Sequence, residues 1–258
     1  MIRSRKIAAA IAFAFLLISI PLYYLEAQGE GKTEQDSYFS AGVAVIISPR
    51  PYAGTDGKVF AVPALSARYK RLFFNGIRGG FDFFKSDNWT GSALVQAQFK
   101  GLEPEDSPFL EGMKTRRKSA DGMLVLRYQG RPVGFRTAFQ KDLLGRSSGE
   151  EVSVQAVTGV PLGKALLLAG IGPRWLSADR VDYYYGVRPS EAAPGRPAYK
   201  GRSSWNWDVS LSAFVGRKSR WSFLTIFNRE GYGLPVKDSP LIDQNGGYTL
   251  VSSLAYRF

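Results

Sequence analysis

The sequence predicts an all-β fold, a transmembrane antiparallel up-and-down β-barrel that follows a cleaved signal peptide. Three observations lead to this prediction. Apolar and polar residues alternate with a period of two over many segments, as expected for strands with one apolar and one polar face. Aromatic residues make up 14% of the chain and gather near the ends of those segments. The chain begins with a basic and then apolar stretch, and it ends on Phe258.

The first residues have the pattern of a secretory signal peptide. Basic residues within 3–6 precede an apolar run over 7–25. Pro21 near the end of this run and the polar residues after it favour cleavage behind Ala27. Leu25 is a poor match to the small residue expected three positions before the cleavage site. The apolar run also approaches the length of a membrane-spanning helix. An uncleaved anchor helix is therefore the alternative.

The chain divides into three parts on this basis. We expect a secretory signal peptide over 1–27, a polar N-terminal segment over 28–37, and the barrel over 38–258. No other segment is apolar enough, over a sufficient length, to form a membrane helix, and no linker marks a second domain.

The last eleven residues are the clearest strand. One face carries Tyr248, Leu250, Ser252, Leu254, Tyr256 and Phe258, and the other carries Thr249, Val251, Ser253, Ala255 and Arg257. On the first face, Tyr248, Leu254, Tyr256 and the terminal Phe258 resemble the C-terminal assembly signal of outer-membrane barrels. The alternative is that an aromatic residue simply ends a strand at the membrane interface. Both interpretations place Phe258 in the barrel wall.

Similar patterns recur through the rest of the chain. Regular alternation predicts strands near 133–140, 151–156, 205–213 and 221–227, and less regular segments predict strands at 38–48, 58–69, 71–78, 79–85, 91–99, 121–129 and 164–176. The count is ten to twelve, and we favour twelve. A soluble β-sandwich also alternates, but its strands are usually about five or six residues long. Longer strands, aromatic residues at strand ends and a polar second face favour the membrane barrel.

The connections between the predicted strands are unequal. Short turns are expected at 130–132 and 216–220, and long polar loops at 100–120, 177–204 and 229–247. Bacterial outer-membrane barrels have short periplasmic turns and longer outer loops. We therefore assign the short turns to the periplasmic side.

Two motifs in these connections have simple interpretations. Residues Gly159–Lys164 look like a phosphate-binding loop, but the spacing is one residue short and Ala165 replaces the metal-binding hydroxyl residue. We interpret them as a turn. The basic run Lys114–Lys118 is interpreted as a solvated loop, with contact to lipid phosphate as the alternative.

Composition excludes several function classes. The chain has no His and no Cys, which removes a Ser-His-Asp triad, thiol nucleophiles and the commonest metal ligands. We expect no enzymatic activity, no cofactor, no metal site and no nucleic-acid partner. The net charge of +12 suits a barrel between anionic lipopolysaccharide outside and anionic murein inside.

The segments Ser48–Asp56, Val62–Leu65, Gly172–Trp175, Tyr183–Val187, Asp238–Ile242 and Leu254–Phe258 occur in the order seen in one known family. On these segments the chain resembles the MipA/OmpV family, the MltA-interacting outer-membrane proteins. The resemblance implies a non-catalytic scaffold that brings a murein lytic transglycosylase together with a penicillin-binding protein. The family has no catalytic residues to carry over. Departures at Ser48, Thr55 and Arg188 leave open whether this member keeps the same partners.

Three functions therefore compete. The first is the scaffold of murein enzymes in the outer membrane of a Gram-negative bacterium. The second is a small diffusion channel or osmotic-response porin, which requires that Arg136, Gln140, Arg174, Asp208 and Arg257 leave an open lumen. The third is a surface adhesin or a lipid-binding barrel, whose basic loops contact outer-membrane lipid or lipopolysaccharide.

Overall fold

A computed structural model describes residues 37–48, 51–216 and 219–258. The predicted signal peptide and nearly all of the polar N-terminal segment, residues 1–36, lie outside these ranges. Within them, no helix is both long and apolar enough to cross a membrane.

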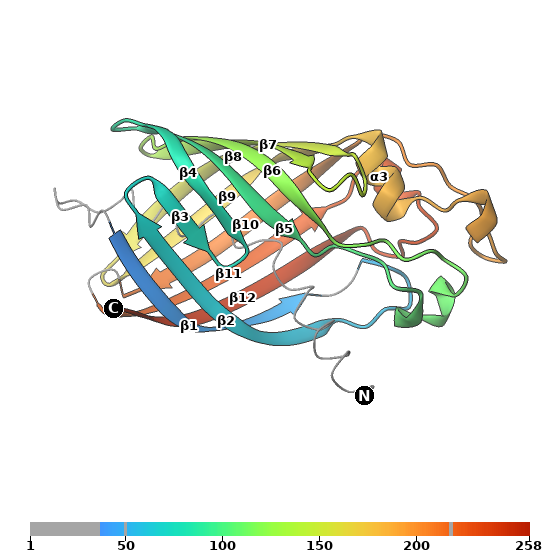
Figure 1. Ribbon diagram of the computed structural model, residues 1–258, viewed down its shortest axis with the longest axis horizontal. Coiled ribbons are helices and arrows are strands. Elements are labelled where there is room, and N and C mark those ends of the chain that lie inside the picture. Colours follow the sequence, from blue (N-terminus) through green and yellow to red (C-terminus); the bar gives the residue numbers. More distant parts are fainter. Residues whose placement is uncertain (1–36, 49–50, 217–218) are drawn as a thin grey trace.

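Twelve antiparallel strands form one closed barrel (Figure 1). They are β1 (Ser37–Ser48), β2 (Lys58–Tyr69), β3 (Leu72–Asn75), β4 (Arg78–Lys85), β5 (Trp89–Gln98), β6 (Ser119–Tyr128), β7 (Val133–Asp142), β8 (Glu150–Leu162), β9 (Ala165–Leu176), β10 (Ser204–Val215), β11 (Trp221–Gly231) and β12 (Gly246–Arg257). Each strand pairs with the next, and β1 closes the barrel by pairing with β12, where Val43 lies opposite Leu254. Closing the sheet joins the two strands that would otherwise be its free edges.

The predicted all-β fold and the count of twelve strands are confirmed, but some boundaries are wrong. The strand expected at 71–78 ends at Asn75, because Gly76 has a positive φ of 59° that begins a hairpin turn to β4. Residues 159–162 were expected to be part of a turn and instead extend β8 to Leu162. Only the tight turn at Gly163 and Lys164 remains between β8 and β9.

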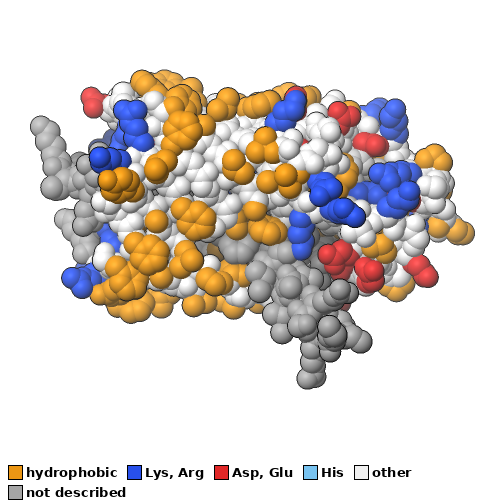
Figure 2. All heavy atoms as spheres, viewed as in Figure 1, with side chains coloured by type: hydrophobic (Ala, Val, Ile, Leu, Met, Phe, Trp, Pro, Cys, Tyr) orange, Lys and Arg blue, Asp and Glu red, His pale blue; other side chains and the backbone are white. Residues whose placement is uncertain are grey.

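The barrel wall is apolar outside and largely polar inside. Exposed outward-facing side chains include Val43, Phe81, Phe135, Trp207, Leu211, Phe223 and Leu254. Buried inward-facing polar side chains include Gln96, Asp121, Arg136, Ser153, Asp208, Ser210 and Thr249. Figure 2 shows the apolar side chains spread over the outside of the wall. A soluble β-sandwich buries its apolar residues, so this reversed arrangement favours the membrane barrel over that alternative.

The two ends of the barrel differ in their connections. One end carries short turns between consecutive strands, including the predicted turn at 130–132, and the chain ends there at Phe258 (Figure 1). Of the turn predicted at 216–220, the structure describes residues 216, 219 and 220, at the same end. We call this the turn end. The other end carries the longer connections, which include the helices α3 (Ala178–Tyr185) and α4 (Leu234–Lys237) and the 3-10 turns η1 (Pro104–Asp106), η2 (Pro108–Leu110) and η3 (Pro189–Glu191). The usual asymmetry of these barrels predicts that the turn end is periplasmic.

The long connections pack into a lid. Residues 51–57, 99–118, 177–203 and 232–245 contribute to one apolar core at the outer end. Its fully buried members include Tyr52, Leu102, Leu110, Val181, Tyr185, Val236 and Leu241. Tyr52 also donates a hydrogen bond to the backbone carbonyl of Tyr184, at 3.1 Å. The sequence indicated long polar loops, but the structure folds them into a small domain-like core of their own.

Candidate functional sites in the lumen and at the two barrel ends

The interior of the barrel is partly filled by apolar side chains. One buried cluster, formed by Ala44, Ile46, Phe60, Val62, Phe214, Leu224, Ile226 and Val251, lies on the inner faces of β1, β2 and β10–β12. A second, formed by Phe73, Leu94, Met123, Val125 and Ala138, lies on β3 and β5–β7. Such packing is typical of a small barrel whose interior is filled by side chains. The sequence pattern did not predict these clusters, because polar residues were expected on the inner face of many strands.

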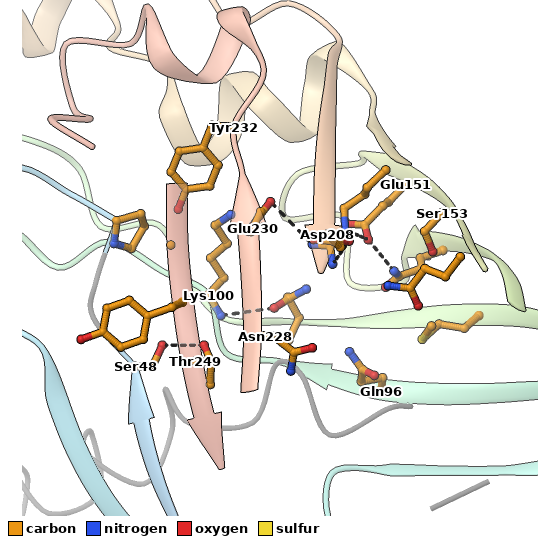
Figure 3. Close-up of a pocket in the computed structure, with 18 of the residues that line it drawn as sticks. Ser48, Gln96, Lys100, Glu151, Ser153, Asp208, Asn228, Glu230, Tyr232 and Thr249 are labelled. Carbon is orange, nitrogen blue, oxygen red and sulfur yellow. Dashed lines mark hydrogen bonds and ion pairs between the residues drawn. The ribbon is translucent and has the colours of Figure 1, made fainter. Parts of the chain in front are cut away.

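A polar cavity of about 110 Å³ remains inside the barrel (Figure 3). Its lining includes Ser48, Gln96, Lys100, Arg136, Gln140, Glu151, Ser153, Gln155, Arg174, Asp208, Asn228, Glu230 and Thr249. One water needs roughly 10–15 Å³ on this measure. The cavity therefore has room for several waters or one small solute.

One side of the cavity is a network of ion pairs centred on Arg174 of β9. Its guanidinium nitrogens lie 2.7 Å from Asp208, 3.4 Å from Glu151 and 3.6 Å from Glu230. Four strands, β8–β11, supply these four side chains. Because three carboxylates surround one guanidinium group, the charge of Arg174 is fully compensated. The sequence analysis placed Arg174 and Asp208 in the lumen, and the structure brings them into contact.

The lid extends this network into the barrel. Arg180 of α3 lies 2.7 Å from Asp121 and 3.4 Å from Glu151. Lys100, which follows β5, donates a hydrogen bond to the hydroxyl of Tyr185 and lies 4.4 Å from the centre of that ring. Burial lowers the pKa of Lys100 to about 8. These contacts tie the lid to the polar half of the lumen.

The other predicted lumen residues have different places. Gln140 lines the cavity and donates a hydrogen bond to Glu151, at 2.7 Å. Arg136 also lines the cavity. Arg257 is at the turn end of β12, where its guanidinium lies 5.7 Å from the centre of the Tyr38 ring. Sequence reasoning missed four members of this site, namely Glu151, Glu230, Arg180 and Lys100.

The lid also contains a buried ion pair that corrects an expectation. Arg116, in the basic run interpreted as a solvated loop, is buried and lies 2.7 Å from Glu191. Burial alone would raise the pKa of Glu191, but hydrogen bonds from Arg116 and from the backbone of Arg188 and Lys114 lower it to about 2. Lys114, Thr115 and Arg117 are exposed and Lys118 is half-buried, so the run is in part a structural element of the lid.

The turn end carries exposed positive charge. The basic rim, as we call it, consists of Lys70, Arg71, Lys85, Arg131, Lys164 and Arg220, all of them exposed. Asp87 is the one acidic residue in the described turns 70–71, 86–88, 129–132, 163–164 and 219–220. Because the acids are so few, the rim is a strongly positive surface.

The four residues of the predicted assembly signal lie along the outside of β12. Tyr248, Leu254 and Phe258 are exposed, and Tyr256 is half-buried. The backbone N–H of Phe258 donates a hydrogen bond to the carbonyl of Phe39, at 3.0 Å, and the two rings stack with their centres 5.6 Å apart. The terminal residue is thus attached to the first strand of the barrel, and its role in assembly stays a proposal.

Neither the cavity nor the lid offers a metal site within the described residues, where no group of three or more acidic side chains is arranged to hold an ion. The carboxylates of the lumen are occupied by arginines instead.

Residues 41–258 match the model of the family described as MltA-interacting protein MipA. The MltA-interacting protein of Escherichia coli (strain K12) is 24% identical over 242 residues, which cover 93% of this chain and 98% of that relative. The outer membrane protein OmpV of Vibrio cholerae is 26% identical over 122 residues, which cover 47% of this chain and 48% of that relative. Among solved structures, an outer membrane channel from Pseudomonas putida F1 has a TM-score of 0.44 at 10% identity, over 89% of this chain and 98% of that one.

Proposed function

Because the chain belongs to the MltA-interacting protein family MipA, we propose that it is a non-catalytic scaffold that binds a murein lytic transglycosylase and a penicillin-binding protein. The resemblance seen in the sequence is confirmed, and the protein is an outer-membrane barrel of a Gram-negative bacterium. The single observation that supports the proposed partners is the basic rim at the turn end.

The rim is placed where murein enzymes can reach it. Murein lies in the periplasm, and the turn end is the periplasmic end by the asymmetry of bacterial barrels. Exposed Lys and Arg side chains on the rim attract acidic protein surfaces and increase the rate of encounter. They also favour contact with anionic murein, so that a bound enzyme is held close to its substrate.

The outer end supports a different set of contacts. Exposed basic residues on the lid, including Lys114, Arg117, Lys200 and Arg202, face the side where lipopolysaccharide phosphate is found. We propose that they contact lipopolysaccharide and leave the enzymes to the turn end. This arrangement would anchor the barrel in the outer leaflet while the rim stays available.

A diffusion channel is the second candidate, and the polar cavity is the observation that favours it. Two observations oppose it. The lid packs around a buried apolar core, and the two apolar clusters fill part of the lumen. Conduction would require both obstacles to move.

The scaffold is tested by capture from detergent-solubilised envelopes. The unchanged protein is compared with a rim variant, Lys70→Gln, Arg71→Gln, Lys164→Gln and Arg220→Gln, and with a matched lid variant, Lys114→Gln, Arg117→Gln, Lys200→Gln and Arg202→Gln. Both variants lose four positive charges. At low salt we expect the rim variant to retain roughly tenfold less lytic transglycosylase than the unchanged protein, because electrostatic attraction increases association by about tenfold or more. The lid variant should retain as much as the unchanged protein.

Two results would contradict the scaffold. One is that no murein enzyme is retained at low salt. The other is equal retention by the two variants. Steady single-channel conductance in planar bilayers, together with no retained enzyme, would favour the channel.

A further inference from the structure

Arg136 of β7 is a buried cation with no ion-pair partner among the residues that the structure describes. Its residue is 8% exposed, and its Nε atom is buried with no hydrogen-bond partner. No carboxylate of the described residues lies within 4.0 Å of its guanidinium group. Arg174, in the same cavity, has three such neighbours. The two arginines share a wall but differ completely in charge compensation.

The charges around Arg136 make its position less favourable still. The strongest charge effects on it come from Arg127, Arg78 and Arg174, which all have the same sign as Arg136, and a weaker one comes from Glu151. Arg127 donates a hydrogen bond to Ser92 and Arg78 donates one to Gln96.

Glu151 is already engaged elsewhere. It accepts a hydrogen bond from Gln140 and lies 3.4 Å from both Arg174 and Arg180. Its carboxylate is therefore shared among groups other than Arg136. Among the described residues, Arg136 therefore has no carboxylate at contact distance.

A second unsatisfied group lies next to Arg136. Gln155 of β8 is its cross-strand neighbour and points to the same inner face. The Oε1 atom of Gln155 is buried and accepts no hydrogen bond. Turning the amide places its NH₂ group in the same position, since the two ends of an amide occupy similar volumes. Ser153 adds a hydroxyl to the same cavity wall.

Burying a charge without a partner is costly, and a buried polar group without a hydrogen bond adds to that cost. An anion between Arg136 and Gln155 removes both costs together. The planar guanidinium group matches the two oxygens of a carboxylate or phosphate. The cavity volume of about 110 Å³ restricts the ligand to a few heavy atoms.

We propose that the lumen binds one small oxyanion, a carboxylate or a phosphate, with Arg136 as its principal ligand and with Gln155 and Ser153 as neutral hydrogen-bonding partners. The bound anion completes the charge balance of the inner wall in the way that Asp208, Glu151 and Glu230 do for Arg174. This site is independent of the scaffold function and stands whether or not the rim binds murein enzymes.

The test uses the folded barrel in detergent, in a chloride buffer free of oxyanions. Isothermal titration calorimetry with inorganic phosphate and, separately, with acetate measures binding and shows which oxyanion is preferred. We expect saturable binding of at least one of them. Arg136→Gln should weaken it at least tenfold, whereas Arg220→Gln, which removes an exposed charge of the rim, should leave it unchanged.

A second variant keeps the test decisive if Arg136→Gln fails to fold. Gln155→Glu places a carboxylate of the chain itself beside Arg136. It should abolish oxyanion binding and at the same time raise the temperature at which the barrel loses its fast, heat-modifiable migration in detergent gels.

Three outcomes would overturn the proposal. The first is that neither phosphate nor acetate binds saturably to the unchanged protein. The second is equal binding to a folded Arg136→Gln variant. The third is full oxyanion binding by Gln155→Glu.

Discussion

The two ends of the barrel contain many charged residues and use them in opposite ways. At the outer end, several charged side chains of the lid turn inward and are buried. Arg116 is paired with Glu191 at 2.7 Å, and Arg180 with Asp121 at 2.7 Å. Arg196 is buried and donates hydrogen bonds to the backbone carbonyls of Glu111 and Glu191. These groups hold the lid together.

At the turn end, the basic rim points into solvent. Most of its residues lie on tight turns, such as the turn at Lys164 between β8 and β9, and Lys85 is the last residue of β4. The wall at this end is held by the backbone pairing of its strands, whereas Lys70, Arg71 and Lys164 of the rim are exposed. The difference teaches that net charge is a poor guide to function until the buried, paired charges are separated from the exposed ones.

The largest expected effect is a difference in stability between the ends. Arg116→Ala leaves Glu191 buried without its partner, and breaking such a pair costs about 3–5 kcal/mol. Lys164→Ala changes an exposed residue, where substitutions usually stay within about 0.5 kcal/mol. Denaturant unfolding of both variants, together with the protease sensitivity of the lid, measures the difference. Equal stability would mean that the lid does not depend on its buried charges.

Acid should weaken the lid before it affects the turn end. The pKa of Glu191 is lowered from about 4.5 to about 2 in the folded protein. Its contribution to stability is therefore complete above pH about 4.5 and is lost as the pH falls toward 2. We expect cleavage of residues 99–118 by an acid-active protease to increase over this range. A Glu191→Gln variant should be more sensitive at neutral pH and should change less on acidification. Parallel acid profiles would remove Glu191 as the cause.

Removing the last residue should affect assembly more than secretion. Phe258 joins β12 to Phe39 of β1 through a hydrogen bond and a ring stack. We expect deletion of Phe258 to lower the amount of folded barrel in the outer membrane while periplasmic export continues. Trp221→Ala, at another exposed aromatic residue of the turn end, is the matched control and should lower the amount less. Unchanged levels after the deletion would make Phe258 an ordinary wall residue.

Much of the wall could be predicted from the sequence. A strand that lies between lipid and a polar interior must alternate apolar and polar residues. Residues such as Trp205 and Trp207 on one face, with Asn206 and Asp208 on the other, carry that signal directly. The extension of β8 through Gly159 was missed, because glycine and proline near its end have the composition of a turn.

The sites were harder to predict, since their contacts join distant parts of the chain. Arg116 and Glu191 are 75 positions apart, and no local pattern distinguishes a buried arginine from a solvated one. Glu151 could have been found, because it lies in the strand predicted near 151–156, on the polar face with Ser153 and Gln155. Glu230 was harder to find, because β11 continues to Gly231 where the sequence predicted the loop 229–247. The lid core depends on residues scattered over four loops, so its packing had no periodic signal.

The direct affinity between the purified barrel and a purified lytic transglycosylase tests the central claim most sharply. Binding is measured in detergent at low and high salt, with the unchanged protein, the rim variant and the lid variant. We expect binding at low salt that high salt weakens, roughly tenfold weaker binding by the rim variant, and no change for the lid variant. Binding that is insensitive to salt and equal for all three proteins would contradict it, as would no binding at all.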